Sequence, residues 1–170
     1  IDYKSSRIKQ YFKEGRALRT ETTINNTRDF AIGKRLANLP DLRQVGFSAN
    51  RRLLDVQSLS HDCNLGEDAF QQLNRPVEVN HQRAAALRFA DPSVQALLSV
   101  LLMFCLLPQG FRNRDLRGHL AALLGEDPQQ LTQGRMTYHL RRLRLHGLIE
   151  RIDGTHAYRL TREGIRIAFF

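Results

Sequence analysis

The feature that most constrains this chain is the order of short patterns near its C-terminal end. Met136, Leu140 and Leu143 recur at the three- and four-residue spacing of a helix that buries one face. Thr132 precedes this stripe and is a suitable N-cap, while Gly147 follows it and is a suitable helix end. The pattern therefore predicts an amphipathic helix between these two residues.

Two short segments of alternating polarity follow this helix almost without a linker. They cover residues 149–152 and 157–160, and Asp153 and Gly154 lie between them. Because an Asp-Gly pair favours a tight turn, we expect the two segments to pair as antiparallel strands. Thr161 is then expected to begin a last helix.

The longest apolar stretch of the chain covers residues 94–107. It is shorter than the roughly 18 to 20 residues that span a bilayer, so it predicts a buried core helix and no membrane partner. Asp91 and Pro92 suit the start of this helix, because Asp accepts free amide hydrogens and Pro lacks one. Asn113 is expected to cap a further helix, which Gly125 ends.

The helix and hairpin together carry a family resemblance. Residues 136–149, with the hairpin and residues 158–161, resemble winged-helix regulators of the ArsR and MarR kind. Those families place a small polar residue, an exposed residue, His and Leu in a row on the recognition helix, as Thr137, Tyr138, His139 and Leu140 stand here. The resemblance covers about residues 92–170 and implies a winged helix that binds DNA. The paired Cys and His ligands of metal-sensing members are absent from the sequence.

The outer side of the predicted helix offers the side chains that a DNA site needs. A helix fits the major groove, and residues in its first turns reach base edges. We expect Arg141 to contact a base, Arg142 and Arg144 to face phosphate or solvent, and His139 to be a half-buried structural imidazole. The expected contacts to double-stranded DNA are Gln133, Arg135, Thr137, Tyr138, Arg141, Arg142, Arg144, Arg151, His156 and Arg159.

The net charge supports a polyanionic partner. The 170 residues carry a formal charge of +9, which favours nucleic acid first and an anionic membrane second. Residues 131–170 hold eight arginines against Glu150, Asp153 and Glu163. Every lysine lies at or before Lys34, so the C-terminal charge comes from arginine, whose planar fork suits phosphate and guanine edges.

The N-terminal part predicts a different local structure. Residues 6–25 alternate polar and apolar around Glu14 and Gly15, which is the pattern of a β-hairpin. This segment also resembles parts of uncharacterised bacterial proteins, some of them from mobile elements, and the resemblance names no activity. The chain begins at Ile1 and ends abruptly, and we interpret it as a piece of a longer protein.

Helical spacing follows the hairpin. The apolar positions of residues 26–74 predict helices, with a break at Gly46 and a cap at Ser48. A short helix is expected around residues 68–73, and the loop that follows it is the expected domain boundary. The fold class is thus α+β and mainly helical, with a hairpin-and-helix module at residues 1–80 and a winged helix at residues 81–170.

Other chemistry has weaker support in the sequence. His61 and Cys63 have a ligand-like spacing but no second pair nearby, so no metal and no cofactor is expected. Glu21 and Asp29 suggest half of a nuclease-like carboxylate set, although an ion pair of Glu21 with Lys9 or Lys13 explains the former. The two cysteines form no disulfide framework, which favours a reducing cytoplasm.

Three functions remain open from the sequence. We favour DNA binding without chemistry, as a transcriptional regulator or as the DNA-recognition part of a larger protein. The alternatives are the C-terminal portion of a DNA-processing enzyme, such as a nuclease, transposase or replication initiator, and a protein-interaction winged helix. Besides DNA, we expect either a homodimer or a contact with a domain that precedes Ile1.

Overall fold

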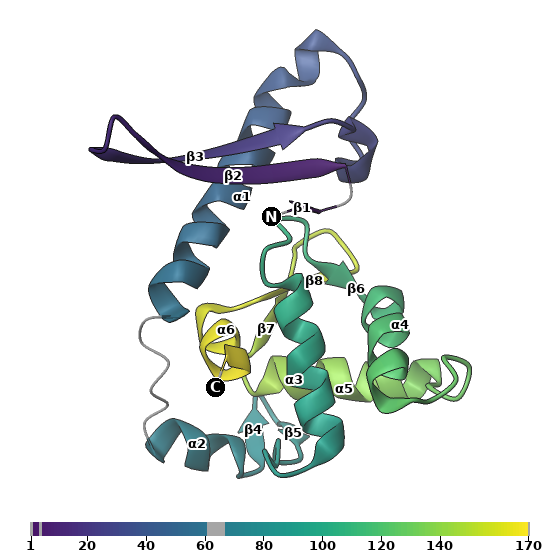
Figure 1. Cartoon of the computed structure of the whole chain (residues 1–170). Helices are drawn as coiled ribbons and strands as arrows, with labels where there is room; N and C mark the ends of the chain where they lie inside the picture. Colours follow the sequence, from purple (N-terminus) through teal and green to yellow (C-terminus); the bar gives the residue numbers. More distant parts are fainter. Residues whose placement is uncertain (1, 4, 61–66, 170) are drawn as a thin grey trace. The chain divides into compact units, whose positions relative to one another are not determined.

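The computed structural model describes residues 2–3, 5–60 and 67–169. The chain divides into two compact units, Ile1–Asp55 and Val56–Phe170, and each is described here by itself. As expected, the fold is α+β and mainly helical, with small antiparallel sheets (Figure 1).

The N-terminal unit is built on the predicted hairpin. Strands β2 (Ser6–Lys13) and β3 (Ala17–Ile24) pair antiparallel along their whole length, and the short β1 (Asp2–Tyr3) adds to β2. Glu14 and Gly15 both adopt positive φ, at 53° and 65°, and so reverse the chain between the strands. The hairpin prediction is therefore confirmed, including its turn.

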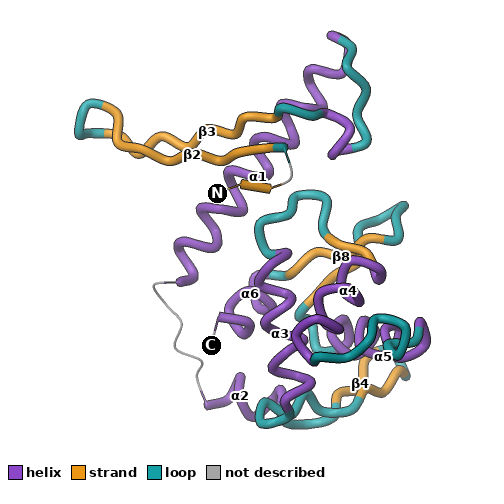
Figure 2. Tube along the Cα trace, turned by 45° about the vertical axis from the view of Figure 1, so that its right-hand side comes forward, coloured by secondary structure: helices purple, strands orange, loops and turns teal. Residues whose placement is uncertain are grey.

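One long helix crosses this hairpin (Figure 2). After the 3-10 turns Thr27–Phe30 and Leu36–Asn38, α1 runs from Leu39 to Ser60. The expected break at Gly46 and the cap at Ser48 are wrong, because the helix packs on β3 at this point. A Cβ at Gly46 would lie 4.0 Å from the Thr22 Cβ.

The C-terminal unit contains five helices and two small sheets among its described residues. The predicted order of elements from the apolar helix to the last helix is found. The elements are α2 (Glu67–Leu73), β4 (Val77–Val79), β5 (Gln82–Ala84), α3 (Pro92–Phe104), β6 (Phe111–Arg112), α4 (Asn113–Leu124), α5 (Gln133–Leu145), β7 (Ile149–Arg151), β8 (Ala157–Leu160) and α6 (Arg162–Phe169).

The expected domain boundary near residue 80 differs from the division in the structure. Residues 56–80 belong to the C-terminal unit because β4 and β5 pack against α5. The Leu87 amide donates to the Leu73 carbonyl at 2.8 Å, which ties α2 to the segment after β5. The division falls after Asp55, in the C-terminal part of α1.

Most of the predicted helix ends are confirmed. Asp91 caps α3 by accepting from the Ser93 amide at 2.9 Å, and Thr132 caps α5 by accepting from the Arg135 amide at 3.2 Å. Asn113 is not the cap of α4 but its first residue. The Arg112 amide donates instead to the Asp115 carboxylate at 2.8 Å, because that carboxylate lies in the first turn.

The predicted pairing of the two C-terminal segments is also confirmed. β7 and β8 are antiparallel, with Ile149 opposite Leu160 and Arg151 opposite Tyr158. β6 pairs with the other edge of β8, so the sheet has the order β6-β8-β7. Gly154 takes the positive φ of 69° that the turn between the strands requires.

The helices and the sheet enclose one apolar core. Six residues of the predicted apolar run are buried along α3, while Met103 on the same helix is 55% exposed. No described helix is long and apolar enough to cross a membrane. The side chains with no exposed area are Val100, Leu101, Leu116, Ala121, Leu131, Met136, Leu143 and Leu148. This core fixes the orientation of α5 from one side.

Candidate nucleic-acid interface

The two faces of α5 differ as the sequence predicts. Met136 and Leu143 are fully buried, and Leu140 is only 4% exposed. The opposite face carries Gln133, Thr137, Tyr138, Arg141 and Arg144, all of them exposed. The core therefore presents a row of polar side chains on a helix that cannot rotate without breaking that packing.

The exposed residues of this row differ in how they are held. The Thr137 hydroxyl donates to the Gln133 carbonyl at 2.8 Å, and an Arg144 nitrogen donates to the Gln82 side chain at 3.3 Å. Arg141 makes no hydrogen bond or ion pair with the described part of the chain. Its guanidinium is thus available to an outside partner.

Arg135 is exposed but partly neutralised. One of its terminal nitrogens lies 2.9 Å from a Glu126 carboxylate oxygen, across the loop between α4 and α5. Sequence reasoning missed this partner, because Glu126 lies outside the helical pattern. The ion pair fixes where the guanidinium points, while its net charge toward a phosphate is reduced.

Arg142 corrects the expected contact set. Its side chain is only 8% exposed, and its guanidinium donates to the carbonyls of Ala85 (at 3.1 Å) and Ala86. His146 adds to this contact, since its Nε2 lies 2.9 Å from the Ala85 carbonyl, which can only accept. Arg142 therefore joins α5 to the segment after β5 and does not face a partner.

His139 is buried at 8% exposure, as expected of a structural imidazole. Burial lowers its pKa, and the nearby positive charges of Arg135 and Arg142 lower it further. Its Nδ1 has no hydrogen-bond partner among the described residues. The ring is therefore neutral at pH 7 and lies behind the exposed row of α5.

The hairpin after α5 brings its polar residues into contact with each other. Arg151 donates to the Thr155 carbonyl at 2.9 Å and lies 3.2 Å from Nδ1 of the exposed His156. Arg159 forms an exposed ion pair with Glu150 across the strands at 2.5 Å, so its charge is partly balanced. Arg151 and His156 are thus the basic groups at the tip of this hairpin, and Arg159 is a weaker candidate.

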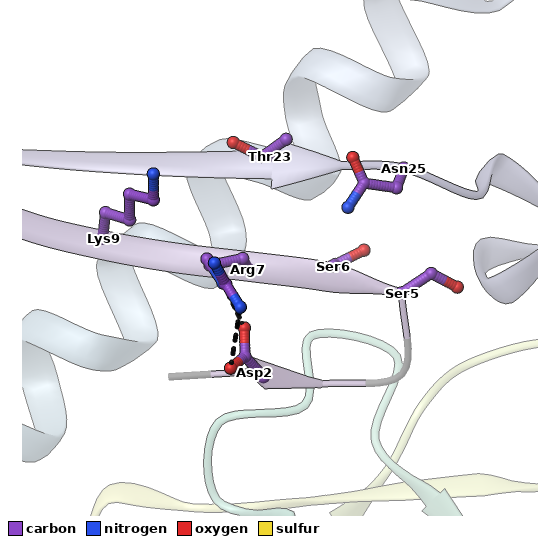
Figure 3. Close-up of a pocket in the computed structure, with 7 residues that line it drawn as sticks. All are labelled: Asp2, Ser5, Ser6, Arg7, Lys9, Thr23 and Asn25. Atoms are coloured by element: carbon purple, nitrogen blue, oxygen red, sulfur yellow. Dashed lines mark hydrogen bonds and ion pairs between the residues drawn. The ribbon is translucent and has the colours of Figure 1, made fainter.

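The N-terminal unit contains a separate polar pocket of about 380 Å³ (Figure 3). Arg7 is directed at Asp2, with 2.6 Å between Nε and a carboxylate oxygen, and this hydrogen bond lowers the pKa of the exposed Asp2. Lys9 lines the same pocket without an ion pair to the described residues. Asp2, Ser5, Ser6, Arg7, Lys9, Thr23 and Asn25 line the pocket.

The nuclease-like carboxylates are engaged in other contacts. Glu21 pairs with Arg19 at 2.9 Å and accepts from the Tyr11 hydroxyl at 2.8 Å, and it forms no ion pair with Lys9, its register partner, or with Lys13. Asp29 accepts from the Ser5 amide and hydroxyl, at 3.2 and 2.8 Å. No group of three His, Cys, Asp or Glu in the described residues could hold a metal ion, and His61 and Cys63 lie outside those residues.

Comparisons of the chain with protein-family models, curated proteins and solved structures find no match.

Proposed function

We propose that the C-terminal unit is a winged helix that binds double-stranded DNA, with α5 as its recognition helix. The order of elements supports this assignment: α3, β6, α4, α5, β7 and β8 follow one another, and the sheet has the order β6-β8-β7. The protein would then act as a transcriptional regulator or as the DNA-recognition part of a larger protein. The family resemblance and the positive net charge favour the same partner.

The observation that carries the proposal is the unpaired Arg141 in the exposed row of α5. Met136, Leu140 and Leu143 hold the opposite face in the core, so the row is held in one orientation. An arginine in such a row can bind the O6 and N7 of guanine with two hydrogen bonds. Gln133 and Thr137 precede it by two turns and by one turn, within reach of the neighbouring base pairs.

The hairpin supplies the second contact of the proposed site. Arg151 and His156 lie together at its tip, where a basic group reaches backbone phosphate or an adjacent groove. Arg144 at the end of α5 is exposed and is assigned to phosphate. Arg142 is left out of the site because it is buried.

Substitution of Arg141 tests this proposal. Arg141→Ala should weaken binding to a selected duplex by about 1–3 kcal/mol and remove the preference at one base pair. Arg28→Ala, an exposed change of the same charge in the N-terminal unit, serves as the control and should leave that preference intact. The measurement is fluorescence anisotropy with random and selected duplexes across a salt series.

Two outcomes would count against the proposal. Equal losses in the two variants would show that Arg141 contributes only charge. If the wild-type chain binds no duplex even at low salt, DNA is not its partner, and the exposed row of α5 is then a protein-interaction surface.

A further inference from the structure

The exposed row of α5 contains one residue that has no side chain, Gly134. It is the second residue of the helix and is exposed. It precedes Thr137 by three residues and Tyr138 by four, which is the spacing of neighbours on one face of a helix. Gly134 therefore lies in the first turn of the surface that is assigned to DNA above.

The backbone at this position does not require glycine. Gly147, which follows the same helix, has a positive φ of 73°, a conformation that residues with a side chain rarely adopt. Gly134 instead has right-handed helical backbone, which every residue type except proline adopts readily. An alanine at position 134 would be unstrained.

Packing does not require glycine either. At Gly164 in α6, an added Cβ would lie 1.9 Å from the Leu148 carbonyl oxygen, so the fold leaves no room for a side chain there. At Gly134, the nearest atom to an added Cβ is Oγ1 of Thr132, at 4.0 Å, which is an ordinary contact. The described part of the chain thus leaves room for a side chain at position 134.

A glycine in a helix also has a cost. It is less favourable than alanine by up to about 1 kcal/mol, because glycine loses more backbone freedom on folding. The fold of the C-terminal unit therefore gains nothing from Gly134. A close approach of the helix backbone to a ligand is the use of glycine that remains.

The neighbours of Gly134 indicate which ligand this is. At 100° per residue, Thr137 and Arg141 lie on one side of the glycine and Tyr138 lies on the other. Arg141 has no partner in the described part of the chain. Side chains of a recognition helix reach base edges when the helix lies in the major groove. A side chain in the middle of the row would hold the helix away from those edges and shorten the reach of its neighbours.

We propose that Gly134 is a positioning residue that sets how deeply α5 enters the major groove. The helix backbone at Gly134 lies directly against the base-pair edges, and this depth brings Thr137 and Arg141 within hydrogen-bonding distance of theirs. The inference rests on the duplex-binding function proposed above, and it adds a residue that acts through its lack of a side chain.

An added methyl group separates the effect on folding from the effect on binding. Gly134→Ala should keep or raise the melting temperature, through helix propensity. It should nevertheless weaken binding to the selected duplex by about tenfold or more, which is the scale of one lost base contact. The base preference that depends on Arg141 should decrease with it, because the guanidinium is then held farther from the base. A residue that only supports the fold would not bind more weakly while it melts higher.

Gly118→Ala is the matched control. Gly118 is an exposed glycine inside α4, and an added Cβ there would have no atom within 4 Å. This variant should also melt at the wild-type temperature or above, and it should bind the selected duplex with unchanged affinity. Equal losses of affinity in the two variants would reflect a general effect of helix propensity and would overturn the inference.

A larger side chain extends the test. Gly134→Leu should weaken binding more than Gly134→Ala does, because the separation of helix and duplex increases with the volume of the side chain. Gly118→Leu again serves as the control. Fluorescence anisotropy with random and selected duplexes measures affinity, and thermal melting measures stability. Wild-type affinity in Gly134→Leu would overturn the inference.

The outcomes keep this inference apart from the proposed function. If Arg141→Ala loses its base preference while both Gly134 variants bind like the wild type, the inference fails and the proposed function stands. If the Gly134 variants lose affinity while Arg141→Ala has no effect, the depth of α5 is supported and the role of Arg141 fails. A wild-type chain that binds no duplex would overturn both.

Discussion

The two units of this chain differ in how much apolar surface they bury. In the C-terminal unit, α3, α4, α5 and the β6-β8-β7 sheet share a core whose central side chains have no exposed area. In the N-terminal unit, the buried apolar side chains are Phe30, Ala49 and Leu53. Large apolar residues exposed there are Tyr11, Phe12, Leu18, Leu36, Leu39, Phe47 and Leu54.

Because of this difference, the exposed side chains of α5 and those of the β2–β3 ribbon are held in different ways. A close-packed core holds the exposed side chains of α5 in fixed positions, which direct contacts to base edges require. The ribbon is held by strand pairing and by the contacts of Asn50 with Thr20 and Thr22, which leave its end projecting.

The largest expected effect tests whether Arg142 belongs to the packed unit or to its surface. Arg142→Ala removes the hydrogen bonds to the carbonyls of Ala85 and Ala86, and it should lower the free energy of unfolding by about 2–3 kcal/mol. Arg141→Ala is the neighbouring control and should stay within about 0.5 kcal/mol of the wild type. Urea unfolding followed by circular dichroism measures both. Equal stability of the two variants would contradict the buried role.

Two glycines sharpen the comparison of packing. A Cβ at Gly164 would lie 1.9 Å from the Leu148 carbonyl oxygen, so Gly164→Ala should destabilise the C-terminal unit by about 1–3 kcal/mol. At Gly46, inside α1, the nearest atom is an ordinary contact at 4.0 Å. Gly46→Ala should therefore stabilise the N-terminal unit by about 0.5–1 kcal/mol, through helix propensity. Thermal melting reports both signs, and a destabilising Gly46→Ala would show tighter packing there than the structure has.

The smallest effect is a pH dependence confined to the packed unit. Burial lowers the pKa of His139 and also of His146, so between their folded values and about 6.5 the unfolded chain binds more protons. Stability should fall as the pH drops below about 6.5 and should level off above it. The slope of the melting temperature between pH 5 and 8 should decrease in His139→Gln. Stability that increases on acidification would contradict the direction of both shifts.

Local patterns in the sequence were sufficient for most of the exposed row and for most of the elements, but not for the strands β1, β4, β5 and β6. The hairpin of residues 6–25, the cap at Thr132 and the turn at Gly154 follow from alternation, capping and backbone preference within a few residues. The buried stripe of α5 follows in the same way from helical spacing. These features depend on neighbours along the chain, so a single sequence contains the information.

Only the tertiary structure decided which charged side chains are paired and whether Gly46 interrupts a helix. The position of Arg142 in the helical pattern predicts a surface residue. Arg142 is buried because it donates to the carbonyls of Ala85 and Ala86, which lie 57 and 56 residues earlier in the chain. Gly46 breaks no helix because β3 packs beside it, and Arg135 is neutralised by Glu126 from a loop. Contacts of this kind form between segments that are distant in sequence, and no periodicity in either segment encodes the other. The sequence by itself thus determined which helix and which strands form, while packing between distant segments decided which of their charges remain free.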